Sequence, residues 1–145
     1  MQERYLITGG AGFIGSNLAH ALIEQGQFVR ILDNFSTGNM ANLSGIEDKV
    51  EIIHGDIRYL NTVTEAVQGI DYILHQAALP SVPRSVETPL ESNDVNINGT
   101  LNMLYAAKEA KVKRLVYAAS SSAYGDTPVL PKVETMKPNP LIMKL

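Results

Sequence analysis

Cysteine is absent from the 145-residue sequence, which excludes disulfide bonds and thiol catalysis and is compatible with a reducing cytoplasm. A strong charge of either sign is absent too. The formal net charge is only −3, and this balance favours neither nucleic acid nor an anionic membrane as a partner. No apolar run approaches the roughly 20 residues that span a bilayer, and glycines interrupt the first one, unlike in a signal peptide. These absences predict a soluble cytoplasmic protein, and we assign no metal ligands.

Short apolar runs alternate with longer amphipathic segments along the chain. The runs predict strands at residues 5–8, 28–33, 50–53, 72–75 and 115–118, and the segments predict helices at about 13–24, 60–67 and 94–110. Strands that alternate with helices are parallel and joined by right-handed crossovers. We therefore expect an α/β fold, a doubly wound parallel sheet with strand order 3-2-1-4-5. A ligand crevice is expected beyond the carboxyl ends of strands one and four.

The length suits one domain, and we assign residues 1–125 to it. After Tyr124 the alternation ends, and a proline-rich segment at 126–145 follows. This segment has no predicted helix or strand. We expect it to be poorly ordered or held by a neighbour.

A glycine-rich segment joins the first strand to the first helix. Gly9 suits the tight turn, Gly12 lets backbone amides approach a pyrophosphate, and Gly15 lets helix and strand pack closely. The helix begins near Phe13 and Ile14, and its N-terminus adds free N–H groups and a partial positive charge for an anion. The pattern predicts a dinucleotide site more strongly than an ordinary glycine turn.

Acidic residues end the second and third strands. Asp33, with Asn34 after it, stands 18 residues beyond Gly15, where a carboxylate accepts hydrogen bonds from the adenosine ribose. The same carboxylate would repel the 2′-phosphate of NADP, so we predict NAD as the cofactor and weaker binding of NADP. Asp56 has two interpretations: it accepts from the adenine amino group with Ile57 against the ring, or it caps the following helix.

Three further motifs complete a family pattern. They are His-Gln-Ala-Ala at 75–78, Asn-Ile-Asn-Gly-Thr at 96–100 and Ala-Ser-Ser-Ser-Ala-Tyr-Gly at 119–125. With them, the sequence from about Arg4 to Leu141 resembles extended short-chain dehydrogenases of the NAD-dependent epimerase/dehydratase family, which have a Rossmann fold. It is most similar to UDP-sugar 4-epimerases, including those that act on N-acetylated UDP-hexosamines.

The resemblance implies roles for residues after the fourth strand. Ala77, Ala78 and Leu79 correspond to backbone contacts with NAD, where small side chains let the dinucleotide pass. Ser81 and Arg84 fall where the family binds its nucleotide-sugar. Arg84 would pair with a diphosphate, although an exposed structural arginine is an equal alternative. For the asparagines at positions 96 and 98 we favour a role in tying the helix start to neighbouring loops over ligand contact.

The resemblance also implies a chemistry. A 4-epimerase passes hydride from C4 of the sugar to NAD and returns it to the other face, while a tyrosine acts as base and a serine or threonine hydrogen-bonds the same hydroxyl. That hydroxyl corresponds to Ser120. Ser121, Ser122 and Tyr124 are assigned to the substrate pocket. Related dehydratases carry Asp-Glu at 121 and 122, so the serines here favour epimerisation or simple oxidation over dehydration.

The family pattern is lost after Leu141, where it calls for Ser-Pro-Tyr, three residues and Lys. This sequence has Ile-Met-Lys-Leu instead, with Lys144 where the tyrosine would stand. We therefore expect an NAD-dependent 4-epimerase of UDP-glucose/UDP-galactose or UDP-GlcNAc/UDP-GalNAc, present here as an inactive N-terminal fragment with an incomplete sheet. The alternative is a non-catalytic NAD-binding module that works with a partner chain. A sheet that ends at the fifth strand exposes an edge and an apolar face, which suggests self-association.

Overall fold

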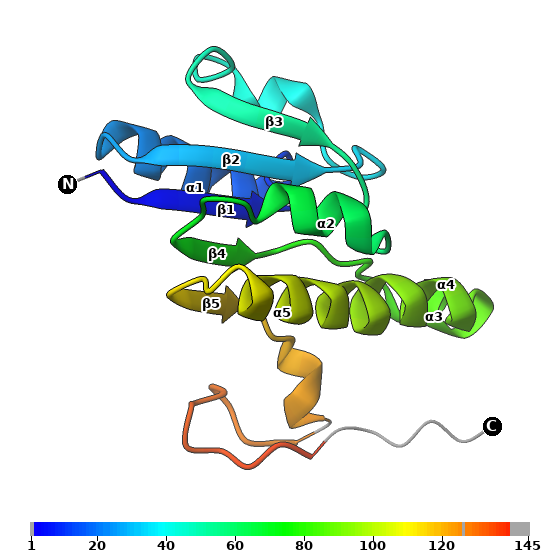
Figure 1. The fold of residues 1–145 in the computed structure, drawn as a ribbon. Coiled ribbons are helices and arrows are strands. Elements are labelled where there is room, and N and C mark those ends of the chain that lie inside the picture. Colours follow the sequence, from blue (N-terminus) through cyan, green and yellow to red (C-terminus); the bar gives the residue numbers. More distant parts are fainter. Residues whose placement is uncertain (1, 126, 140–145) are drawn as a thin grey trace.

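The computed structural model describes residues 2–125 and 127–139, so Leu141 and Lys144 lie outside the described residues. Its centre is a parallel sheet with the order β3-β2-β1-β4-β5 (Figure 1). The strands are β1 (Arg4–Thr8), β2 (Phe28–Asp33), β3 (Val50–His54), β4 (Tyr72–His75) and β5 (Arg114–Tyr117). The predicted fold class, strand order and strand positions are therefore confirmed.

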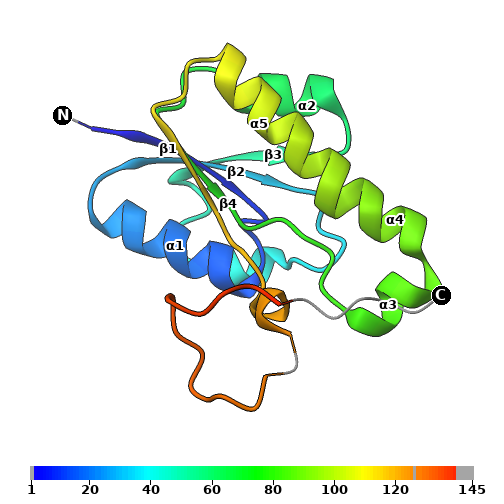
Figure 2. The ribbon, with the colours of Figure 1, turned by 90° about the horizontal axis from the view of Figure 1, so that it is seen from below.

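Helices cover both faces of this sheet. On one face lies α1 (Phe13–Glu24) with the 3₁₀ turn η1 (Met40–Leu43), and on the other lie α2 (Leu60–Ala66) and α5 (Thr100–Glu109) (Figure 2). Right-handed crossovers of parallel strands produce this doubly wound, Rossmann-type arrangement. No helix within residues 2–125 or 127–139 is long and apolar enough to cross a membrane.

Two hydrophobic cores hold the layers together. Neighbouring strand residues point to opposite faces, so Leu6 packs in the core beneath α2 and α5 with Ile73 and Met103. Ile7 and Ile31 pack in the core beneath α1. Strands buried on both faces read as nearly continuous apolar runs, and the first two strands do so apart from Arg30 in β2.

The long predicted helix differs from the observed one at its start. A continuous helical segment begins with α4 (Pro89–Asn93), passes through the π-helical turn η2 (Asp94–Gly99) and ends with α5. Before it lies α3 (Val82–Glu87), which the sequence analysis did not predict. Prolines occupy the first turns of both α3 and α4, where a missing N–H costs nothing.

The chain leaves the sheet after β5 through a 3₁₀ turn, η3 (Ser121–Tyr124). The part of the tail that is described, 127–139, contains turns and bends but neither helix nor strand. Within this described part, the Asn139 amide donates to the Ala123 carbonyl of η3 at 2.8 Å.

Candidate functional site

A cleft of about 750 Å³ opens at the carboxyl ends of the strands. Its walls come from the turn after β1, the ends of β2 and β3, the segment after β4, and helices α3 and α4. All the residues predicted to bind the cofactor line it: Gly9, Gly12, Phe13, Ile14, Gly15, Asp33, Asn34, Asp56, Ile57, Ala77, Ala78 and Leu79. Of the predicted substrate residues, Arg84 also lines this cleft.

The glycine turn between β1 and α1 leaves no room for side chains. Gly9 has a φ of +67°, and a Cβ there would lie 2.9 Å from the backbone Cα and N of Ala77. A Cβ on Gly15 would collide with the Gly9 carbonyl oxygen. Gly12 is the N-cap of α1 and offers no side-chain acceptor, so the first-turn amides remain available to an anion. This cradle fits a pyrophosphate.

Asp33 joins the end of β2 to the glycine turn. The side chain is 7% exposed; its Oδ2 accepts from the Ala11 amide at 2.9 Å and its Oδ1 from the Phe35 amide at 2.8 Å. Each carboxylate oxygen keeps a further lone pair. The carboxylate is thus fixed in place while it can still accept from a ligand hydroxyl in the cleft.

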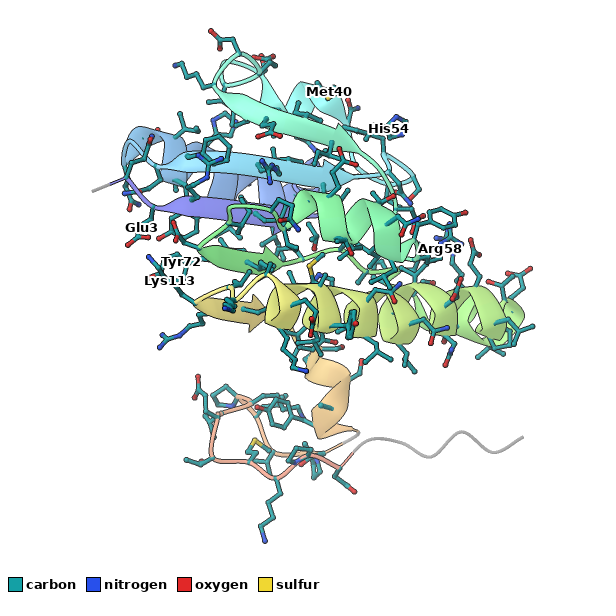
Figure 3. The ribbon with its side chains drawn as sticks, in the orientation of Figure 1. Glu3, Met40, His54, Arg58, Tyr72 and Lys113 are labelled. Atoms are coloured by element: carbon teal, nitrogen blue, oxygen red, sulfur yellow. The ribbon has the colours of Figure 1, made fainter. Side chains whose placement is uncertain are left out.

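Asp56 forms a clasp with Arg58 and Asn34. Arg58 donates from Nε to Oδ1 at 3.0 Å and from Nη2 to Oδ2 at 2.7 Å, and Asn34 donates to Oδ2 at 2.8 Å. Burial of Asp56 opposes ionisation, but these hydrogen bonds outweigh it and hold its pKa at about 2. Figure 3 shows Arg58 at the opposite end of the sheet from Glu3 and Lys113.

The clasp decides one of the two interpretations of Asp56. The N-cap of α2 is Tyr59, without a side-chain cap, and the Asp56 carboxylate accepts from the Arg58 amide at 2.9 Å instead. The helix-capping interpretation is therefore wrong, because the two-residue turn to Arg58 captures the carboxylate. Contact with adenine stays a prediction. Arg58 also lines the cleft, and the sequence analysis did not identify it. The spacing of two residues between Asp56 and Arg58 was the signal that could have predicted their pairing.

The segment after β4 is held by side chains from elsewhere. The Asn96 side chain accepts from the Leu79 amide at 2.8 Å and donates to the Leu79 carbonyl at 3.1 Å, so its predicted role in tying helix to loop is confirmed. Asn98 instead donates to Asp94 of the same helical turn, so that part of the prediction is wrong. On the other wall, Asn102 donates to the carbonyls of the two residues that follow Asp56, at 3.1 and 2.9 Å.

The remaining predicted residues lie outside the lining of this cleft. Ser81 caps α3 by accepting from the Arg84 amide at 3.3 Å. Ser120 caps η3, its Oγ accepting from the Ser122 amide at 3.1 Å. The described structure brings together the predicted cofactor residues but does not bring to them Ser81, Ser120, Ser121, Ser122 and Tyr124. No group of three or more His, Asp or Glu side chains among the described residues could hold a metal ion.

The model of the NAD dependent epimerase/dehydratase family matches residues 5–143. The chain belongs to this family. A putative UDP-glucose 4-epimerase of Methanocaldococcus jannaschii is 40% identical over 139 residues, which cover 94% of this chain and 44% of the relative. NAD, the predicted cofactor, is the cofactor of the family.

Solved structures agree with this assignment. The UDP-N-acetylglucosamine 4-epimerase of Methanobrevibacter ruminantium, in complex with UDP-N-acetylmuramic acid, has a TM-score of 0.87 and 37% identity over 97% of this chain and 45% of its own. The UDP-glucose 4-epimerase of Thermus thermophilus, in complex with NAD, has a TM-score of 0.85 and 38% identity over 94% of this chain and 44% of its own. This chain spans less than half the length of each of these three proteins.

Proposed function

We propose that residues 1–125 form the NAD-binding domain of a UDP-sugar 4-epimerase. The observation that carries the proposal is the gathering of every predicted cofactor residue along one cleft. The glycine turn would hold the pyrophosphate, Asp33 the adenosine ribose, and the clasp of Asn34, Asp56 and Arg58 the adenine end. The segment 77–79 would pass its backbone beneath the dinucleotide.

NAD supplies the hydride acceptor and donor for the sugar C4 when it is bound. In this chain the Ser120 hydroxyl would hydrogen-bond the 4-hydroxyl of the sugar. Ser120 Oγ accepts from the Ser122 amide, so the hydroxyl hydrogen of Ser120 is still available to donate. Ser81, Arg84, Ser121 and Tyr124 would meet the nucleotide-sugar. With serine at 121 and 122, no acid stands next to Ser120 to drive an elimination, which favours epimerisation of UDP-glucose or UDP-GlcNAc over dehydration.

We further propose that this chain alone does not turn over UDP-sugars. No tyrosine in its sequence is followed by a lysine four residues later, so the base that the family resemblance calls for is lacking. The second candidate function is a non-catalytic NAD-binding module that acts through a partner chain, which is supported by the gathering of the predicted cofactor residues along one cleft. Either role suits the cytoplasm, where NAD and UDP-sugars are found together.

The decisive experiment is a calorimetric titration of the purified chain with NAD and with NADP. NAD is expected to bind and NADP to bind much more weakly, because Asp33 is buried and held by two amides at the place proposed for the adenosine ribose. Comparable affinities would overturn the assignment of Asp33, and no binding of either would overturn the cofactor site. A parallel assay of UDP-GlcNAc and UDP-glucose should show no epimerisation; turnover would contradict the proposed inactivity.

The exposed outer face of β5 and α5 supports a proposal of self-association. Large hydrophobic side chains are exposed to solvent there: Ile97, Leu101, Leu104, Tyr105, Val116 and Tyr117. A shallow apolar hollow lies between α5 and β5. Patches of this kind mark interfaces, so we expect concentration-dependent association in sedimentation velocity. A single monomer boundary at high concentration would contradict it.

A further inference from the structure

A buried chain of hydrogen bonds runs behind the cleft segment 77–79. At its centre is His75, the last residue of β4, which is 1% exposed and stacks on Tyr117 at 5.8 Å. Its Nδ1 lies 2.6 Å from the Thr8 hydroxyl oxygen, and its Nε2 lies 3.1 Å from that of Thr100. The imidazole therefore joins β1, β4 and α5 through polar atoms, on the face of the sheet that α5 covers.

The number of available hydrogens fixes the direction of this chain of hydrogen bonds. The Thr100 hydroxyl donates to the Asn96 carbonyl at 2.8 Å, so its oxygen can only accept from His75, and Nε2 must carry the hydrogen. Nδ1 is then unprotonated and accepts from the Thr8 hydroxyl. Thr8 Oγ1 in turn accepts from the Ala77 amide at 3.2 Å. Every hydrogen has one acceptor, and only the Nε2–H form of the neutral ring allows this.

The chain of hydrogen bonds ends at the cofactor cleft. The Ala77 amide is bound by Thr8, and the Leu79 amide and carbonyl are bound by Asn96, so the segment is held at both ends. Gly9 packs directly against it, because a Cβ at Gly9 would lie 2.9 Å from the Cα of Ala77. A displacement of Ala77 would therefore displace the glycine turn as well.

We propose that His75 is a positioning residue for the cofactor cleft: its neutral Nε2–H form orients the Thr8 hydroxyl to accept the Ala77 amide and so fixes both the segment 77–79 and the glycine turn. The effect of His75 on NAD binding rests on the proposed function, whereas its effect on the orientation of the segment 77–79 does not. Burial lowers the pKa of His75 to about 4, which keeps the ring uncharged at neutral pH.

The test combines histidine NMR with amide exchange and NAD titration. Long-range ¹H–¹⁵N correlation of ¹⁵N-histidine-labelled protein at pH 7 should show the proton of His75 on Nε2. Thr8→Val and Thr100→Val remove one hydroxyl each at constant shape, while Thr8→Ser and Thr100→Ser keep it. Each Val variant should speed exchange of the Ala77 amide and weaken NAD binding roughly fivefold to tenfold, the effect of one net hydrogen bond, and each Ser variant should restore both.

Thr64→Val, on the exposed surface of α2, is the matched control and should change neither measurement. A proton on Nδ1 in the unmodified chain would overturn the proposal without any variant. So would Val variants that fold and leave Ala77 exchange unchanged. If the unmodified chain binds no NAD, the proposed function fails, but the tautomer and the amide exchange still decide whether His75 positions the segment.

Discussion

Burial of His75 predicts that the chain loses stability in mild acid. Its pKa is lowered from 6.5 to about 4 because the ring is desolvated. Between these two pH values the unfolded chain binds a proton that the folded chain does not, so the free energy of unfolding falls as the pH falls from 6.5 to 4 and is independent of this group above that range. At about 1.36 kcal/mol per pKa unit, the full loss is about 3 kcal/mol.

Such a loss is large beside the roughly 5–15 kcal/mol that hold a typical domain. Urea unfolding followed by circular dichroism at half-unit steps from pH 7.5 to 4 measures it directly. Asp56 does not interfere, because its pKa is lowered from the ordinary 3.8 to about 2, so its contribution to stability is lost mainly between these two pH values. His54→Gln, at an exposed position, should keep the slope and His75→Gln should remove it. A stability that stays level from pH 6.5 to 4.5 would refute the reasoning.

Three substitutions test the packing around helices α1 and α2. Gly15→Ala places a Cβ against the Gly9 carbonyl and should cost roughly 1–3 kcal/mol of stability, seen in thermal unfolding, and abolish NAD binding in calorimetry. Arg30→Met should cost about 2–4 kcal/mol in urea, because Arg30 is 9% exposed and its Nη1 donates at 2.8 Å to the carbonyls of Ala66, the last residue of α2, and of Gln68. Asn102→Leu removes two hydrogen bonds to the segment before α2; it should cost about 1–2 kcal/mol and weaken NAD binding, and an unchanged NAD affinity would contradict the role given to this wall.

The features predicted correctly from the sequence are those with local causes. Apolar runs buried on both faces mark parallel strands, and their alternation with amphipathic segments leaves few topologies. The end of α1 is equally local: the helix was predicted to end at about residue 24, and Gly26 follows it with a φ of +72°, a conformation that glycine adopts without strain.

The features that were missed depend on contacts between distant segments or on an ambiguous signal. Prolines 83 and 89 normally break helices, yet here each lies in a first helical turn, so α3 and α4 were not anticipated. The carboxylate of Asp56 had two local uses, and only the packing of Arg58 and Asn34 around it excluded the cap. The motif at 75–78 includes His75 but does not indicate its hydrogen-bond partners, which are 67 and 25 residues away.

The two groups of predicted site residues differ in how the fold supports them. The predicted cofactor residues follow β1 to β4. Three side chains cross between the walls of the cleft: Asp33 accepts from the Ala11 amide, Asn96 accepts from the Leu79 amide, and Asn102 donates to the Ile57 carbonyl. Ser120 and its neighbours follow β5, which like β3 is an edge strand, and are held by a bond within their own turn and by the Asn139 amide on the Ala123 carbonyl. The cleft proposed for the dinucleotide is therefore built independently of Ser120, the proposed catalytic serine. We predict that binding of NAD survives substitutions at 120–124, even where the same substitutions abolish epimerisation in a longer relative.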